Sequence, residues 1–199
     1  MSKKLITLVD YFEKNCSKNK FIFEIETKKK KYHKDVLRSS NDIYLNQNFQ
    51  RGEKLSIILP NSILFIEYFI ASIKAGCIFN PIPYFTSVYE LKKIFSFIKP
   101  SRIITDRKDI FDNFSELYQV TMSNEIKNKT LYNQIKLNNY KKDIVAIYYS
   151  SGTTGNPKGI MYSNKNMVSL ISSINRCFKF NKNDKHLALL PFGHTASIN

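Results

Sequence analysis

One short segment of the chain, residues 149–159, combines the residue types that can bind a polyphosphate. It places serine, threonine and glycine residues in close succession and ends with Lys158-Gly159. Glycines let backbone N–H groups approach phosphate oxygens closely, small hydroxyl groups donate hydrogen bonds, and a lysine adds a positive charge. The segment therefore predicts a phosphate-binding loop.

Two other interpretations of this segment are open. A P-loop spaces its glycines more widely and ends on Gly-Lys-Ser/Thr before a helix. Here Gly152 and Gly155 are three residues apart, Pro157 precedes the lysine, and an apolar, strand-like stretch follows. A loop that only reverses the chain would need a much shorter turn. Long loops between strands are more often functional, which favours phosphate binding over both alternatives.

Apolar runs with the length of strands occur along the whole chain. In Lys20–Glu26, apolar residues alternate with the period of a half-buried strand, with Phe21, Phe23 and Ile25 on one side. Two continuous apolar runs are typical of strands buried on both faces of a sheet, Leu55–Leu59 and Leu187–Leu190. Further strands are expected at Ile78–Pro83, Arg102–Thr105, Ile144–Tyr149 and Gly159–Tyr162, and a turn at the lysine run Lys28–Lys31.

Helical patterns lie between these strands. The clearest covers Ser87–Ile98, where Ser87 and Glu90 have the spacing of a capping box and Pro100 stops the helix. Strands that alternate with amphipathic helices predict an α/β fold with mostly parallel sheets flanked by helices. The other expected helices are Leu5–Phe12, Lys34–Leu45, Ser62–Lys74 and one that carries Met167, Leu170, Ile171, Ile174 and Phe178 on one face.

Composition limits the classes of function. The chain has 199 residues with 31 Lys+Arg against 16 Asp+Glu, a formal charge of +15, which keeps a nucleic-acid-binding module as an alternative. However, the lysines are scattered and no nucleic-acid-binding motif accompanies them. The three cysteines and three histidines lack metal-ligand spacing, and no apolar run reaches the roughly 20 residues of a membrane span. We expect a cytoplasmic protein with no transmembrane segment, no metal ligands in this chain and no specific nucleic-acid partner.

The loop also carries a family resemblance. Residues 149–159, Tyr-Ser-Ser-Gly-Thr-Thr-Gly-Asn-Pro-Lys-Gly, closely resemble the signature phosphate loop of the adenylate-forming superfamily of acyl-CoA synthetases, peptide-synthetase adenylation domains and luciferases. The resemblance extends over residues 51–76, and Asn80-Pro81-Ile82-Pro83 is closer to acyl-CoA synthetases. Residues 191–194, Pro-Phe-Gly-His, resemble the motif that lines the acyl pocket of that family.

This resemblance implies an enzyme that uses ATP to activate a carboxylic acid. The carboxylate attacks the α-phosphorus of ATP, pyrophosphate leaves, and the thiol of coenzyme A or of a carrier protein then takes the acyl group. Lys158 would neutralise the pyrophosphate, and His194 would border the carboxylate end of the acid. The residues expected to bind ATP are Ser150, Ser151, Gly152, Thr153, Thr154, Gly155, Asn156, Pro157 and Lys158.

Three positions depart from the family pattern. Asn164 stands where histidine is common, and we expect it to cap the helix that follows. Gly193 replaces a bulky residue before His194, and Ser197 stands where glycine is frequent. The last two changes are expected to alter the shape of the acyl pocket.

By the same resemblance, residues 1–199 correspond to the N-terminal portion of an AMP-binding domain, without the small C-terminal domain. The family's Mg²⁺-binding glutamate, ribose-binding aspartate and catalytic lysine are expected downstream. We therefore expect the chain to be inactive alone, either as the front of a complete enzyme, as a truncated remnant, or as half of an enzyme whose C-terminal half is separately encoded. We also expect an open sheet edge and an exposed apolar face, which would promote self-association or binding of hydrophobic dyes.

Overall fold

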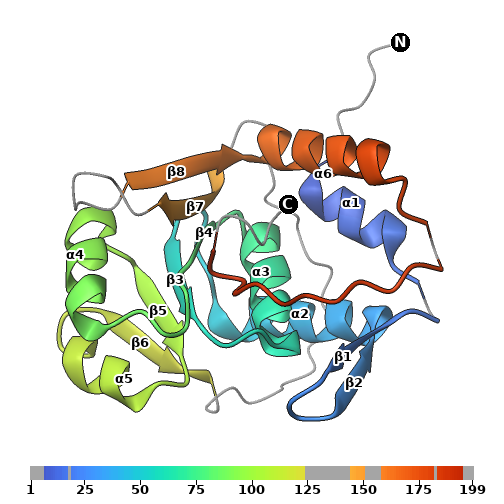
Figure 1. Ribbon diagram of the computed structural model, residues 1–199. Helices are drawn as coiled ribbons and strands as arrows, with labels where there is room; N and C mark the ends of the chain where they lie inside the picture. The colour runs from blue at the N-terminus through green and yellow to red at the C-terminus, as the bar shows by residue number, and fades with distance from the viewer. Residues whose placement is uncertain (1–6, 18, 124–143, 151–157, 182, 195–199) are drawn as a thin grey trace.

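The computed structural model describes residues 7–17, 19–123, 144–150, 158–181 and 183–194. Its centre is a six-stranded sheet in the order β6-β5-β3-β4-β7-β8 (Figure 1). Neighbouring strands pair in parallel from β6 to β7, and β8 pairs antiparallel with β7. The strands are β3 (Lys54–Ile58), β4 (Ile78–Pro81), β5 (Arg102–Thr105), β6 (Gln119–Met122), β7 (Ile144–Ser150) and β8 (Lys158–Ser163). The predicted α/β fold with a mostly parallel sheet is confirmed.

Helices cover both faces of this sheet (Figure 1). Helices α2 and α3 lie on one face and α4 and α5 on the other, while α1 packs beside α6 and α3. The helices are α1 (Leu8–Asn15), α2 (His33–Gln47), α3 (Ile63–Ala75), α4 (Val88–Ile98), α5 (Lys108–Phe114) and α6 (Asn164–Phe178). Among the described residues, none of these helices combines the length and apolarity needed to cross a bilayer.

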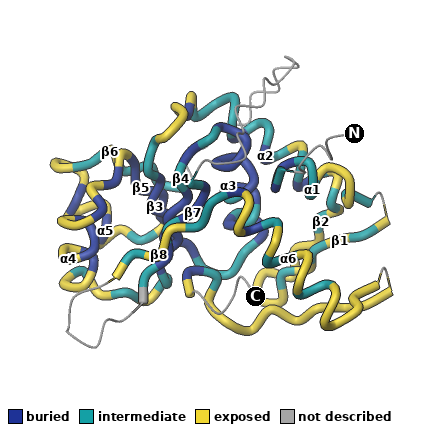
Figure 2. The backbone as a smooth tube through the Cα atoms, turned by 90° about the horizontal axis from the view of Figure 1, so that it is seen from above, coloured by how far each residue is buried: buried dark blue, intermediate teal, exposed yellow. Residues whose placement is uncertain are grey.

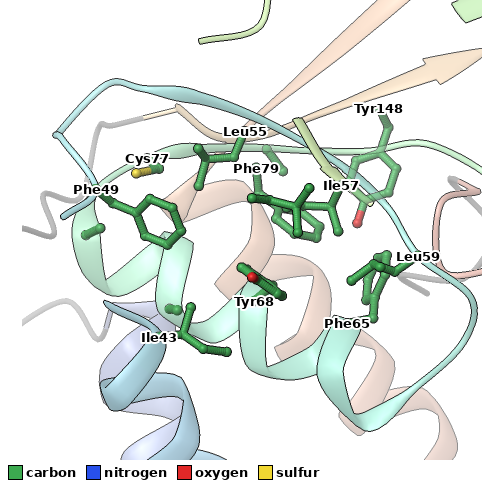
Figure 3. Packing of buried hydrophobic residues seen from close by; sticks show 14 residues of the cluster. Ile43, Phe49, Leu55, Ile57, Leu59, Phe65, Tyr68, Cys77, Phe79 and Tyr148 are labelled. Atoms are coloured by element: carbon green, nitrogen blue, oxygen red, sulfur yellow. The ribbon is translucent and has the colours of Figure 1, made fainter. Parts of the chain in front are cut away.

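The two faces of the sheet are filled by alternate residues of the same strands. Ile57 points into the cluster under α3, with Tyr68 and Phe79 (Figure 3), whereas the next residue, Ile58, packs under α4. A parallel sheet is stable only when both faces are covered, which is why its strands are apolar at consecutive positions. This arrangement leaves the carboxyl ends of β3, β4 and β7 together at one edge of the sheet.

Helix α4 begins as its sequence predicted. The Ser87 hydroxyl accepts a hydrogen bond from the Glu90 amide at 3.2 Å, and the Glu90 carboxylate accepts one from the Ser87 amide at 3.1 Å. This capping box satisfies N–H groups that have no partner inside the first helical turn. Helix α3 is also confirmed, with Ser62 as its N-cap and Gly76 at φ 73° as its C-cap.

Replacing Ser87 with alanine should lower the free energy of unfolding by about 1 kcal/mol, because the Glu90 amide loses its acceptor. For a chain of this size the melting temperature should fall by about 2–4 °C. Urea and thermal unfolding followed by circular dichroism measure both quantities. Ser96→Ala is the matched control, since the exposed Ser96 hydroxyl only donates to the Lys93 carbonyl in the same helix. Equal losses in both variants would contradict the capping role.

The N-terminal hairpin differs from the sequence prediction in two respects. Only Lys28 of the lysine run lies in the turn, whereas Lys29–Lys31 belong to β2 (Lys29–Tyr32), which pairs antiparallel with β1 (Phe21–Glu24). The aromatic side of β1 faces outward, with Phe21 48% exposed, whereas Ile22 packs against α2 and α3. The hairpin is attached through its charged residues: Glu24 accepts from the Ile63 amide at 3.0 Å, and Lys31 pairs with Glu67 at 2.5 Å.

The predicted buried strand at Leu187–Leu190 is wrong. These residues form no strand, and the chain from the end of α6 to Leu190 is exposed where it is described, with Leu189 78% exposed (Figure 2). An apolar run of four residues has no strand partner unless a neighbouring sheet edge is available. Among the described residues, this segment pairs neither with β6 or β8, the edge strands of the six-stranded sheet, nor with β1 or β2. Leu187, Leu189 and Leu190 are instead exposed on an irregular segment.

Asn164 is not the cap of α6. Ser163 is the N-cap, with its hydroxyl accepting from the Asn166 amide at 3.2 Å. Asn164 is instead buried, and its side-chain oxygen accepts from the Leu8 amide at 2.8 Å, which ties the start of α6 to the start of α1. Helix α5 and strand β6 were not predicted, because their short sequences have little periodicity.

Candidate functional site

The predicted phosphate loop connects two adjacent antiparallel strands. Ser150 at the end of β7 pairs with Lys158 at the start of β8, and Tyr149 pairs with Gly159. Residues 151–157, which include Ser151, Gly152, Thr153, Thr154, Gly155, Asn156 and Pro157, lie outside the described residues. The P-loop interpretation is wrong, because a strand and not a helix follows the loop.

The two tyrosines before the loop hold its first strand in the sheet. Tyr148 is buried and meets Tyr162 of β8 edge to face, with ring centroids 5.8 Å apart. Tyr149 packs on the opposite face, in the cluster under α4. Burial raises the pKa of the Tyr149 phenol to about 12 and also raises the pKa of Tyr148. Both phenols therefore stay protonated near neutral pH and act in packing rather than in proton transfer.

A buried asparagine fixes the position of β7 beside β4. The Ser56 hydroxyl donates to the Asn80 side-chain oxygen at 2.8 Å, and the Asn80 side-chain amide donates to the Ile147 carbonyl at 2.9 Å. The side chain of Asn80 thus links β3, β4 and β7. This link adds to the backbone pairing of β4 with β7, for which the paired residues are Phe79 and Ala146. The strand that carries the loop is placed by this link as well as by its own packing.

The predicted acyl-pocket motif lies at the same edge of the sheet. Residues 191–194 form a turn in which the His194 amide donates to the Pro191 carbonyl at 2.9 Å. A β-carbon built on Gly193 would lie 2.3 Å from both the Ile82 carbonyl carbon and the Pro83 nitrogen, just after β4. No side chain fits at that distance, so glycine is required here for this close approach. The turn is exposed at His194 itself.

The structure therefore places the two ends of the predicted loop near the turn 191–194. Strands β4 and β7 are parallel neighbours, so the residues after β4 and the start of the loop lie at the same edge. Lys158, whose side chain is exposed, begins β8 at that edge, and the turn with His194 packs against Ile82. Ser197, the third departure from the family pattern, lies outside the described residues.

Two residues of the site were not assigned a role from the sequence, Asn61 and Asn80. Asn61 contacts the turn at 191–194, and Asn80 orients β7. The available signal was a polar residue at the end of, or inside, an apolar strand. The described residues contain no group of three or more His, Cys, Asp or Glu side chains that could hold a metal ion.

Comparison with known proteins gives the family. A family model described as AMP-binding enzyme matches residues 29–199. The 4-coumarate–CoA ligase CCL1 of Humulus lupulus is 28% identical over 180 residues, which cover 75% of this chain and 31% of that protein. Long chain acyl-CoA synthetase 4 of Arabidopsis thaliana is 44% identical over 59 residues, which cover 27% of this chain and 9% of that protein.

The fold agrees with this match. The structure of ATP-bound MatB from Rhodopseudomonas palustris has a TM-score of 0.84 and 18% identity, and the alignment covers 97% of this chain and 42% of that chain. The chain thus spans about a third of the curated hop ligase. Because the family model covers most of the sequence and the fold is shared throughout, the chain belongs to the AMP-binding enzyme family of the adenylate-forming superfamily.

Proposed function

We propose that this chain forms the nucleotide-binding part of an enzyme that activates a carboxylic acid with ATP and transfers the acyl group to a thiol. The observation that carries the proposal is the junction of two motifs at one edge of the sheet. The loop between Ser150 and Lys158 starts where β7 ends, and the turn with His194 packs just beyond the neighbouring strand β4. A triphosphate at the first and a carboxylate at the second would be adjacent.

In the first half-reaction an oxygen of the carboxylate attacks the α-phosphorus of ATP. The bond from this phosphorus to the bridging oxygen breaks, pyrophosphate leaves with that electron pair, and an acyl-adenylate remains. The chain's contribution would be positioning and charge stabilisation, which need no nucleophilic side chain. Lys158 would offset the charge that develops on pyrophosphate, and Ser150, Ser151, Thr153 and Thr154 with the backbone of Gly152 and Gly155 would donate to its oxygens.

In the second half-reaction a thiolate attacks the acyl carbonyl carbon and AMP leaves, which gives a thioester. Coenzyme A is the proposed thiol, because the segment Asn80–Pro83 resembles acyl-CoA synthetases most. A carrier-protein thiol would use the same chemistry. Residues 1–199 are proposed to be the N-terminal portion of the adenylation domain, and Mg²⁺ bound with ATP is proposed to meet a glutamate outside these residues.

Acid-dependent exchange of labelled pyrophosphate into ATP tests the proposal. The assay should be run with short, medium and long fatty acids and with aromatic acids, on the 199-residue chain and on any longer polypeptide that contains it. We expect exchange from the longer polypeptide with at least one acid, and none from the 199 residues alone. Absence of exchange with every acid from a polypeptide as long as the relatives would contradict the proposed activity. Strong exchange by the 199-residue chain would contradict its expected inactivity.

A further inference from the structure

Asn61 joins two parts of the chain that are far apart in sequence. It lies between β3 and α3, and its side-chain amide donates to the Leu190 carbonyl at 2.8 Å. Its side-chain oxygen accepts from the Phe192 amide at 2.7 Å. Both halves of one amide side chain thus bind the backbone on either side of Pro191. These two hydrogen bonds join residues that are 129 and 131 positions apart in the sequence.

Two further contacts support the same turn. The ring of Phe192 lies on Phe65 of α3, with centroids 5.2 Å apart. Gly193 is buried and packs so closely on the backbone of Ile82 and Pro83 that a β-carbon would overlap it. Asn61, Phe65 and the backbone just after β4 therefore all contact the turn 191–194 or the residue before it, and this turn ends at His194.

The described residues just before this turn are irregular. Residues 183–190 form no helix or strand, and Leu187, Leu189 and Leu190 are exposed. Residues 190–193, by contrast, contact Asn61, Phe65 and the backbone just after β4, next to His194. Among these, the two hydrogen bonds of Asn61 are directional, so they define the orientation of the turn better than the packing of Phe192 does.

We propose that Asn61 is a positioning residue for the acid-binding side of the site: its amide side chain binds the backbone of Leu190 and Phe192 and thereby helps to place His194, at the end of the turn 191–194, beside the carboxylate. The inference rests on the proposed function. Displacement of a binding group by about 1 Å can reduce a rate on the order of a hundredfold. Asn61 should therefore affect recognition of the acid and leave recognition of ATP unchanged, since ATP is bound through the loop after β7.

The contact itself is tested without any activity measurement. Amide hydrogen exchange of Phe192, followed by NMR on the 199-residue chain, should become about tenfold faster in Asn61→Ala, because the amide loses its acceptor. Asn61→Asp keeps an acceptor for that amide and loses the donor to Leu190, so the Phe192 amide should stay more protected than in Asn61→Ala. Ser62→Ala is the matched control, since it removes the N-cap of α3 and leaves both Asn61 contacts in place. Equal protection of Phe192 in parent and Asn61→Ala would overturn the proposal.

The role in acid binding is tested by steady-state pyrophosphate exchange on the longest polypeptide that contains this chain. Asn61→Ala should raise KM for the acid about tenfold and change KM for ATP less than about twofold. Gly193→Ala moves the same turn by steric overlap with Asn61 intact, so it should show the same acid-specific change. Ser62→Ala should change neither KM. If KM for ATP rises as much as KM for the acid in Asn61→Ala, the residue only supports the fold and the inference is wrong.

The outcomes separate this inference from the proposed function. Exchange by the parent with an unchanged KM for the acid in Asn61→Ala would support the function and overturn the positioning role. No exchange by the parent with any acid would overturn the function and the role of Asn61 together. Faster exchange of the Phe192 amide combined with an acid-specific rise in KM supports both.

Discussion

Replacing Lys158 with alanine should slow acid-dependent pyrophosphate exchange about ten- to hundredfold. The lost contact is a charge-assisted one to pyrophosphate, worth about 1.5–3 kcal/mol. Lys158 is exposed at the start of β8, opposite Ser150, so its ammonium is available to a phosphate bound at the loop. The transfer of the acyl group from preformed acyl-adenylate to the thiol should change much less, because pyrophosphate has left by then.

The matched control for this prediction is Lys165→Ala. Lys165 is also exposed, and it lies in the first turn of α6, beyond the other end of β8. The Lys165→Ala variant should leave the rates of both half-reactions unchanged. This control distinguishes the local effect of the Lys158 charge from the general effect of the chain's net charge of +15. A fall of the same size in both half-reactions for Lys158→Ala would mean that the loop is structural and that its assignment to phosphate is wrong.

Replacing Asn80 with alanine should lower the free energy of unfolding by about 3 kcal/mol. Asn80 and Ser56 are fully buried, and the substitution leaves the Ser56 hydroxyl and the Ile147 carbonyl without their partner in the core. A buried polar group without a partner costs about 1–3 kcal/mol. The loss should also reduce pyrophosphate exchange, because β7 leads into the proposed phosphate loop. Urea unfolding of the 199-residue chain measures the first effect.

A double-mutant cycle with Ser56→Ala identifies the cause. Ser56→Ala removes one hydrogen bond and should cost about 1 kcal/mol. In the double variant Ser56→Ala/Asn80→Ala the unsatisfied hydroxyl is gone, so the total loss should be smaller than the sum of the single losses by about 1 kcal/mol. Additive losses would show that Asn80 contributes through packing alone and that the link between β3, β4 and β7 is of little energetic value.

Much of the fold could be predicted from local sequence. Helix α4 was recognised from Ser87 and Glu90. The side chain of each residue accepts a hydrogen bond from the backbone amide of the other, and the two residues are only three positions apart. Helix α3 was bounded by Ser62 and Gly76 for similar local reasons. Strand β3 was recognised because a strand with two covered faces must be apolar at consecutive positions. Each of these signals depends on residues that are neighbours in sequence.

The predictions that failed required knowledge of neighbours in space. Leu187–Leu190 is apolar enough for a strand, but a strand also needs a partner edge, and this segment has none among the described residues. Phe21 and Phe23 alternate as predicted, yet the hairpin is attached by its other side. Asn164 has the chemistry of a cap, and its side chain instead binds the Leu8 amide 156 residues away.

The site divides in the same way. The sequence by itself indicated the family and the proposed phosphate loop, because glycines, hydroxyl groups and a lysine in that order form a local pattern suited to phosphate. Only the tertiary structure decided that the loop and the turn with His194 share one edge of the sheet, through the parallel pairing of β4 and β7. The contact of Asn61 with that turn could also be known only from the tertiary structure. Asn61 and Leu190 are 129 residues apart in the sequence, and a hydrogen bond between them requires that the fold bring them together.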